Sequence, residues 1–139
     1  MRLGVRSSEV CEVLRAAALS PLPQAPPTVE GVLNLRGWMT PVLDARAVLG
    51  IDSRPMHYND HLLVLSVQQR RIALHVDRAI GLWELERAAE SAQASPWIEF
   101  AAQLDQSVVH VIRTERWLAC GDEQQDVRRL EAVNTEKTG

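Results

Sequence analysis

The chain has 139 residues and a formal net charge of −3 at pH 7, with 46% apolar and 24% charged residues. These values fit one globular domain and exclude a wholly disordered chain, and the acidic balance argues against nucleic acid as the main partner. No apolar run is long enough to span a membrane and the first residues lack a signal-peptide pattern, so we expect a cytoplasmic protein without membrane insertion.

The N-terminal part of the chain predicts a helix followed by a proline-rich connection. Residues 8–15 (SEVCEVLR) predict a short helix, with Ser8 as its cap and Glu9 and Glu12 in its early turns. Four prolines then fall within residues 21–27, which excludes a helix interior or a central strand there. We therefore expect an extended surface connection after the helix.

Two short apolar runs on either side of Gly37 predict a β-hairpin. The runs are residues 31–36 (GVLNLR) and 38–44 (WMTPVLD). Pro41 in the second run indicates an edge strand or a bulge. Asp44 can cap a short helix over residues 45–49, which Gly50 would end.

A second predicted hairpin follows a polar loop over residues 50–60. Its strands are residues 62–67 (LLVLSV) and 71–76 (RIALHV). Further strands are predicted over residues 79–85 and 108–112, and helices over residues 84–94 and beyond Asp122. Short strands at close spacing with few helices predict a mainly β domain built from two small sheets.

Motifs for catalysis are absent from the sequence. There is no GxSxG, GxGxxG or Walker-type glycine loop, so we expect neither an enzyme nor a cofactor. Cys11 and Cys120 lie far apart, which predicts two reduced thiols rather than a zinc site or a disulfide. His57, Asp60 and His61 keep a small metal- or ligand-binding β-barrel open as an alternative, although the loop residues around them and the lack of HExxH argue against it.

The first predicted hairpin carries two motifs at a fixed distance from each other. Residues 31–37 read GVLNLRG and residues 41–44 read PVLD. In order and spacing they resemble the signature of the CheW-like family, the scaffold proteins of bacterial chemotaxis arrays. Residues 10–13 (VCEV) and the hairpin over residues 62–77 resemble further family segments, and residues 97–98 and 108–118 resemble its closing strands. The resemblance covers roughly residues 3–118.

The resemblance implies two small SH3-like, five-stranded β-barrels with short helices. It implies a single CheW-like domain over residues 1–120, followed by a C-terminal helix or flexible tail over residues 121–139. The first barrel would take about residues 1–50 plus a late segment of the chain, and the second about residues 60–112. The first barrel would lack the N-terminal strand that the family normally carries, which leaves a strand edge open to a partner strand or to self-association.

The resemblance also implies a non-enzymatic adaptor that couples the cytoplasmic tip of chemoreceptors to the regulatory domain of a CheA-type histidine kinase. In the family the first barrel meets the kinase, and a groove between the barrels takes the receptor's helix hairpin. Arg36 has two interpretations: a partner contact, or a clamp that holds carbonyl oxygens and Asp44 across the hairpin. The expected partner-binding residues are Val10, Glu12, Gly31, Asn34, Leu35, Arg36, Gly37, Leu62 and Val76.

A second hypothesis keeps the fold and changes the role. The open strand edge could mark a degenerate relative that sequesters or modulates the kinase without joining receptor arrays. An oligomer that forms through this edge would favour that hypothesis.

Overall fold

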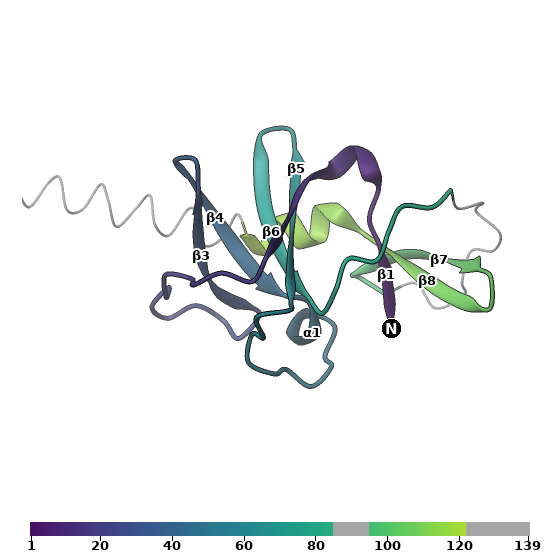
Figure 1. Cartoon of the computed structure of the whole chain (residues 1–139), viewed down its shortest axis with the longest axis horizontal. Coiled ribbons are helices and arrows are strands. Elements are labelled where there is room, and N and C mark those ends of the chain that lie inside the picture. The colour runs from purple at the N-terminus through teal and green to yellow at the C-terminus, as the bar shows by residue number, and fades with distance from the viewer. Residues whose placement is uncertain (85–94, 122–139) are drawn as a thin grey trace, which may run out of the picture.

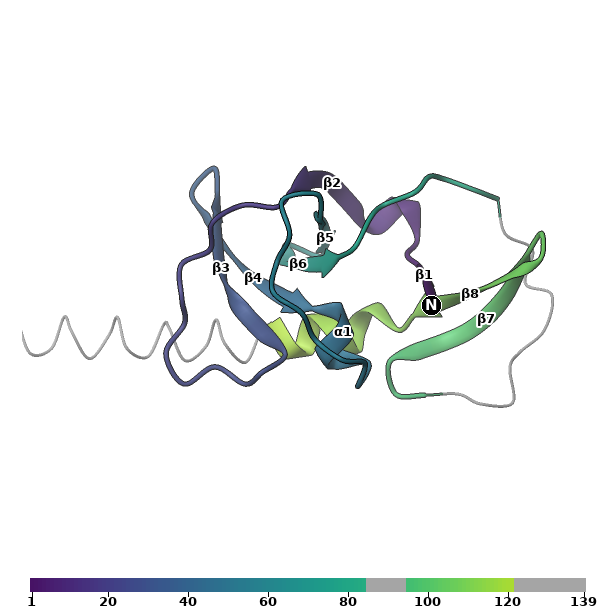
Figure 2. The same ribbon diagram turned by 60° about the horizontal axis from the view of Figure 1, so that its bottom comes forward.

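The computed structural model describes residues 1–84 and 95–121, and these residues form two β-sheets joined by a helix (Figures 1 and 2). Its helical segments are a 3₁₀ turn, η1, at Ser7–Glu9, the helix α1 at Ala45–Val48, and a helix over residues 114–121. The strands are β1 (Arg2–Gly4), β2 (Val10–Arg15), β3 (Val29–Leu35), β4 (Trp38–Asp44), β5 (His61–Val67), β6 (Arg70–Val76), β7 (Ile98–Leu104) and β8 (Ser107–Ile112). The larger sheet has the order β2-β5-β6-β4-β3, and the smaller sheet has the order β1-β8-β7.

The five-stranded sheet curls into a small barrel. Its strand order puts β2 and β3 at the two edges, and the chain that follows β2 meets β3 through a bridge between Ser20 and Val32. The Ser20 N–H donates to the Val32 carbonyl over 3.0 Å, and the Val32 N–H donates back over 2.9 Å. Leu14 and Leu33, from the two edges, pack against the same inner cluster. The curled sheet therefore encloses its own apolar core.

The wall of this barrel is buried on both faces. The outer face is covered by the helix over residues 114–121, which explains why β5 and β6 are apolar along almost their whole length rather than alternately apolar and polar. Burying a Leu or Ile side chain completely stabilises the fold by about 1.5–3 kcal/mol, so the two clusters dominate the stability. The inner cluster is Val42, Leu62, Val64 and Ala73. The outer cluster includes Leu43, Leu65, Ile72, Leu74, Trp117 and Leu118.

Both predicted hairpins and the short helix after the first one are confirmed. Asp44 is the N-cap of α1, and its carboxylate accepts a hydrogen bond of 3.0 Å from the Arg46 N–H, while Gly50 follows the helix with φ +72°. The prediction that Pro41 marks an edge strand was wrong, because β4 lies between β3 and β6, and the irregularity in the β3–β4 pairing lies between Val29 and Gly31 rather than at Pro41. Pro41 is tolerated there because the pairing with β6 begins only at the next residue, Val42.

The predicted helix over residues 8–15 was wrong, because most of this segment is the strand β2. Its residues alternate between partly buried and exposed, which is the period of a strand. The backbone of β2 pairs with β5 from Val10 to Arg15. Tertiary pairing thus overrides the local helix signal of Ser8 and Glu9, which form only the 3₁₀ turn η1.

The later predictions were partly wrong. The expected strand over residues 79–85 is irregular in its described part, where Gly81 has φ +153° and lies against the Trp83 ring. The expected closing strand over residues 108–118 ends at Ile112, because the next segment turns into the helix that buries Trp117 and Leu118. The helices expected over residues 84–94 and beyond Asp122 lie outside the described residues.

The strands also group differently from the expected division into barrels. β5 and β6, which were expected in a second barrel over residues 60–112, pair with the strands of residues 10–44. β1 instead joins β7 and β8, through parallel pairing with β8. The smaller sheet therefore has three strands in the described part of the chain, where five were expected. The physical reason is that β5 and β6, apolar on both faces, are stable only in the middle of the larger sheet.

Candidate functional site

The turn between β3 and β4 carries most of the residues that the sequence singles out. Arg36 and Gly37 form this turn, with φ values of +51° and +88°, which match the type of two-residue turn that suits a twisted hairpin. The exposed Asn34 side chain accepts a hydrogen bond of 2.9 Å from the Gly37 N–H through its Oδ1 atom. Leu35 is partly buried and packs against the inner cluster. Asn34 and Gly37 thus shape the turn that presents Arg36.

Arg36 does not clamp Asp44, so that interpretation of its role was wrong. The two residues lie at opposite ends of β4, because the turn precedes Trp38 while Asp44 ends the strand. The Arg36 guanidinium is 80% exposed and its Nη2 atom lies 3.5 Å from the Glu12 Oε2 atom on β2. An exposed ion pair of this kind contributes about 0–1 kcal/mol, so the guanidinium keeps most of its freedom to contact a partner.

Gly31 lies inside the barrel wall rather than on a binding surface. It is buried on β3, and a Cβ atom placed on it would lie 2.6 Å from the Ser20 carbonyl oxygen and 3.1 Å from the Leu19 Cβ atom. Only glycine allows the chain after β2 to approach β3 this closely. Gly31 therefore supports the surface around the turn by letting the barrel close.

The other expected binding residues divide between the core and a groove. Leu62 is fully buried in the inner cluster and is out of reach of a partner. Val10 and Val76 are partly buried, pack against the outer cluster and line the groove. The sequence brings these three residues together with Glu12 only through the pairing of β2, β5 and β6.

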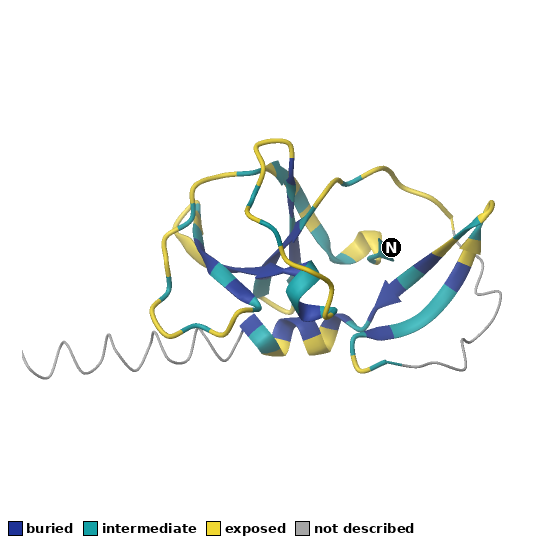
Figure 3. Cartoon of the chain, turned by 90° about the horizontal axis from the view of Figure 1, so that it is seen from below, coloured by how far each residue is buried: buried dark blue, intermediate teal, exposed yellow. Residues whose placement is uncertain are grey.

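The groove lies between the barrel and the three-stranded sheet and has a volume of about 1200 Å³. Figure 3 shows the hairpin of β7 and β8 standing apart from the barrel, with the helix over residues 114–121 connecting them. The walls are mostly apolar and come from three parts of the chain. They include Val13 and Leu63 of the barrel, Leu3, Phe100, Val109 and Val111 of the smaller sheet, and Ile80, Leu82 and Trp83 of the segment after β6.

The sequence reasoning missed the segment after β6 as a functional surface. Ile80 and Trp83 are each 47% exposed and Leu82 is 80% exposed. Three large apolar side chains at such exposure, side by side along one groove wall, are typical of a surface that a partner covers. The signal in the sequence is the break in the β pattern at Gly81, inside the predicted strand over residues 79–85.

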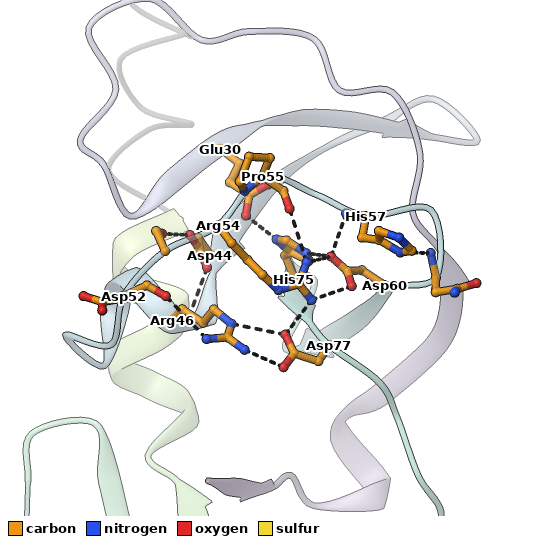
Figure 4. Close-up of polar contacts among 12 residues, drawn as sticks. Glu30, Asp44, Arg46, Asp52, Arg54, Pro55, His57, Asp60, His75 and Asp77 are labelled. Atoms are coloured by element: carbon orange, nitrogen blue, oxygen red, sulfur yellow. Dashed lines mark hydrogen bonds and ion pairs between the residues drawn. The ribbon is translucent and has the colours of Figure 1, made fainter.

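A buried ionic network holds the loop over residues 51–60 against one end of the barrel (Figure 4). His75 on β6 is 3% exposed, and its Nε2 atom lies 2.7 Å from the Asp60 Oδ2 atom while its Nδ1 atom contacts Glu30. Arg54 donates two hydrogen bonds to Asp60, of 3.0 and 2.7 Å, and a third of 2.9 Å to Asp77. Each charge thus has an opposite charge beside it, which buried ions require.

The network shifts the pKa values of its members in the directions that its contacts dictate. The hydrogen bond with Glu30 raises the pKa of His75 to about 9, with support from Asp60 and against the effect of burial. Burial opposes ionisation of Asp60, but the bonds from Arg54, the His57 N–H and His75 hold the Asp60 pKa well below its usual range. At neutral pH both residues are therefore charged.

The alternative metal site at His57, Asp60 and His61 is not formed. The His57 Nδ1 atom accepts a hydrogen bond of 3.1 Å from the Asn59 N–H, and the His61 Nδ1 atom accepts one of 2.8 Å from the Ala79 N–H. Asp60 is occupied by the network described above. Each ring therefore has a structural role in the loop, and within the described residues the ligand atoms of these three side chains do not form a group within 4.8 Å of one another.

Another group in the network, Glu30, Asp44 and His75, has ligand atoms within 4.8 Å of one another. These atoms are already bonded to one another or to neighbouring groups. His75 contacts Glu30, and Asp44 accepts a hydrogen bond from the Arg46 N–H and contacts Ser53. The group is satisfied without an ion, and we interpret it as part of the fold. Cys11 and Cys120 form no disulfide within the described residues, and no helix in residues 1–84 and 95–121 is long and apolar enough to cross a membrane.

Comparisons with known proteins agree with the signature segment. A family model described as the CheW-like domain matches residues 1–120. The protein FrzA of Myxococcus xanthus is 54% identical over 44 residues, and the chemotaxis protein CheW of Rhizobium meliloti is 38% identical over 58 residues. These matches cover 32% and 42% of this chain, and they span only 28% and 37% of the two relatives.

A solved structure supports the fold independently. The scaffolding protein TtCheW from Thermoanaerobacter tengcongensis matches with a TM-score of 0.73 at 21% sequence identity, over 80% of each chain. With the family model covering most of the chain, the chain belongs to the CheW-like family, whose members are non-enzymatic scaffold proteins of chemotaxis signalling.

Proposed function

We propose that this protein is a cytoplasmic adaptor that couples the cytoplasmic tip of a chemoreceptor to the regulatory domain of a CheA-type histidine kinase. The observation that carries the proposal is the presence of two separate candidate surfaces on one chain. One is the β3–β4 turn at the end of the barrel, and the other is the apolar groove between the two sheets. No residue of the turn lines the groove, so two partners can bind at once.

The first surface, which we call the turn surface, suits the kinase domain. It consists of Glu12, Asn34, Leu35, Arg36 and Gly37 together with the exposed side chain of Trp38, which is 47% exposed. The Arg71 guanidinium lies 4.7 Å from the centre of the Trp38 ring. Tryptophan and arginine are the residue types that most often carry binding energy at protein interfaces, and here both stand on rigid hairpins.

The second surface, the groove, suits the helix hairpin of a receptor tip. A helix lays an apolar stripe into a groove whose walls are apolar, and the walls here come from the barrel, the smaller sheet and residues 78–83. Val10 and Val76 support the barrel wall of this groove. Because the adaptor binds both partners, it raises their effective concentration near each other, and the receptor can then act on the kinase.

The experiment is calorimetry of the chain with the kinase regulatory domain from the same organism, followed by addition of a receptor-tip fragment. We expect binding of each partner alone and a ternary complex when all three are mixed. Arg36→Ala should weaken kinase binding by about three- to tenfold and leave receptor binding unchanged. Arg116→Ala, which changes another exposed arginine, on the helix over residues 114–121, is the matched control. Competition between the two partners for one surface would contradict the proposal.

A second candidate function rests on the edge of the smaller sheet. β1 pairs with β8 only, so its other edge has no strand beside it in the described part of the chain. Such an edge can add a strand from a partner or from a second copy, and a protein that self-associates there could sequester the kinase instead of joining arrays. Light scattering after gel filtration tests this candidate: a dimer that binds kinase and excludes the receptor tip would favour it.

A further inference from the structure

The groove has an unusual charge for this protein. The chain as a whole carries a net charge of −3. The described residues that line the groove include four arginines, Arg2, Arg6, Arg46 and Arg78, and a single carboxylate, that of Asp77. With His75 left aside, because it is bonded to Glu30 and Asp60, the lining has a surplus of three positive charges. A cationic groove in an acidic protein points to an anionic partner.

Two of these four arginines are already engaged. Arg46 donates to Asp77 over 2.6 Å, and Arg6 donates to Glu99 over 2.7 Å. Both contacts neutralise the charge of the guanidinium group involved. Once these two ion pairs are counted, a surplus of two positive charges remains, and it comes from the other two arginines.

Arg2 and Arg78 are exposed and form no ion pair or hydrogen bond with any residue of the described ranges. Arg2 is on β1, at the edge of the smaller sheet, and Arg78 follows the end of β6 on the barrel. Both line the groove, Arg2 as part of the wall from the smaller sheet and Arg78 as part of the wall from the barrel and the segment after β6. Two free cations therefore flank an apolar floor.

The apolar floor with an arginine on either side indicates what kind of surface a complementary partner presents. An apolar floor binds an apolar stripe, and cations on both sides bind carboxylates on both sides of that stripe. We infer that the groove selects an amphipathic helix whose apolar stripe is flanked by acidic residues, and that Arg2 and Arg78 bind those carboxylates. The inference deepens the proposed function, on which it rests, by naming the chemistry of the helix that the groove accepts.

The two arginines act more on selection than on affinity. Ion pairs at the rim of an interface contribute little each, but like charges placed opposite one another are costly, so a basic helix would be rejected. Rim charges also raise the association rate, and this effect falls when salt screens the charges. Apolar contact with the floor provides the remaining affinity.

The test compares two synthetic helical peptides with the same leucine stripe, one flanked by glutamates and one flanked by lysines, with the receptor-tip fragment as a third ligand. We expect the acidic peptide to bind about tenfold more tightly than the basic peptide at low salt, with the difference shrinking at high salt. The variant Arg2→Gln/Arg78→Gln should bring the two peptides to within about twofold of each other. The matched control Arg15→Gln/Arg116→Gln has the same net charge and changes exposed arginines away from the groove, so it should keep the discrimination.

The outcomes separate this inference from the proposed function. A preference for the acidic peptide that disappears in Arg2→Gln/Arg78→Gln and persists in the control variant supports the inference. Equal binding of the two peptides, or receptor-tip binding that is insensitive to both Arg2→Gln/Arg78→Gln and salt, overturns the inference and leaves the proposed function intact. If neither peptide nor the receptor tip binds, both fail. Unchanged thermal melting of the variants shows that they are folded.

Discussion

Replacing Gly31 with alanine tests the claim that this residue closes the barrel. The added Cβ atom would lie 2.6 Å from the Ser20 carbonyl oxygen, which is a backbone atom in the Ser20–Val32 bridge. On its other side it would lie 3.1 Å from the Leu19 Cβ atom, whose side chain packs against the inner cluster. The strain cannot be relieved by rotating a side chain, so the segment after β2 must move away from β3.

The size of the effect follows from these contacts. Overpacking a close-packed site costs about 1–3 kcal/mol, and each of the two bridge hydrogen bonds contributes about 0.5–1.5 kcal/mol that is lost if the segments separate. We expect Gly31→Ala to lower the free energy of unfolding by about 2–4 kcal/mol. For a domain of this size that corresponds to a fall in Tm of roughly 5–15 °C.

The assay is urea unfolding followed by tryptophan fluorescence, since Trp117 is fully buried and reports on the core. Gly37→Ala is the matched control: a Cβ there meets nothing within 4 Å, and the only cost is the left-handed φ of +88°, about 1–2 kcal/mol. If Gly31→Ala were no more destabilising than Gly37→Ala, the close approach of the chain after β2 would not be the reason that this position requires glycine.

The ionic network and the outer cluster yield three further predictions. Because the pKa of His75 is raised from 6.5 to about 9, the stabilisation from its charged form is complete below pH 6.5 and is lost as the pH rises through 9. The stabilisation from Asp60, whose pKa is lowered from 3.8, is lost only in strong acid. The urea midpoint should therefore be lower at pH 9.5 than at pH 6, and this difference should be smaller in His75→Gln. Asp60→Asn should lower the free energy of unfolding by about 3–5 kcal/mol, because Arg54 and His75 keep their charges and lose the carboxylate that pairs with them. The control Asp52→Asn, at an exposed position, should change the free energy of unfolding by under about 0.5 kcal/mol. Trp117→Phe should lower the free energy of unfolding by about 1–3 kcal/mol, because it leaves space in the core and removes the 3.0 Å hydrogen bond from the indole N–H to the Trp97 carbonyl. Trp83→Phe, at an exposed position, should leave the free energy of unfolding nearly unchanged.

The sequence predicted the parts of the fold that local chemistry determines. The β3–β4 turn follows from Gly37, and the start of α1 follows from the capping side chain of Asp44, because both signals act within a few residues. The strand β2 was mistaken for a helix because Ser8 and Glu9 are good helix-start residues, whereas its pairing with β5 involves residues some fifty positions away. The predicted assignment of strands to the two sheets was wrong for the same reason, because no local sequence feature distinguishes a hairpin of one sheet from a hairpin of the other.

The candidate site shows the same division between local and distant information. Asn34, Arg36 and Gly37 belong to one signature segment and lie together as expected. The groove could not be predicted, because its walls combine residues from β1, β2, β5, β8 and the irregular segment after β6. The ionic network was missed because Glu30, Arg54, Asp60 and His75 are spread over three segments, and each of them alone looks like an ordinary polar residue.

Asp77 links the buried network to the groove. It is bonded to Arg46 and Arg54, and through Arg54 it is joined to Asp60 and His75 (Figure 4). Because Asp77 directly follows β6, these bonds fix the starting point of the segment that carries the apolar wall residues over positions 78–83. In its described part the segment has no sheet pairing of its own, so its position depends on this anchor and on the hydrogen bond from the Ala79 N–H to the His61 Nδ1 atom. The charged end of the barrel therefore does for the groove what Gly31 does for the turn surface: it holds a binding surface in place from inside the fold.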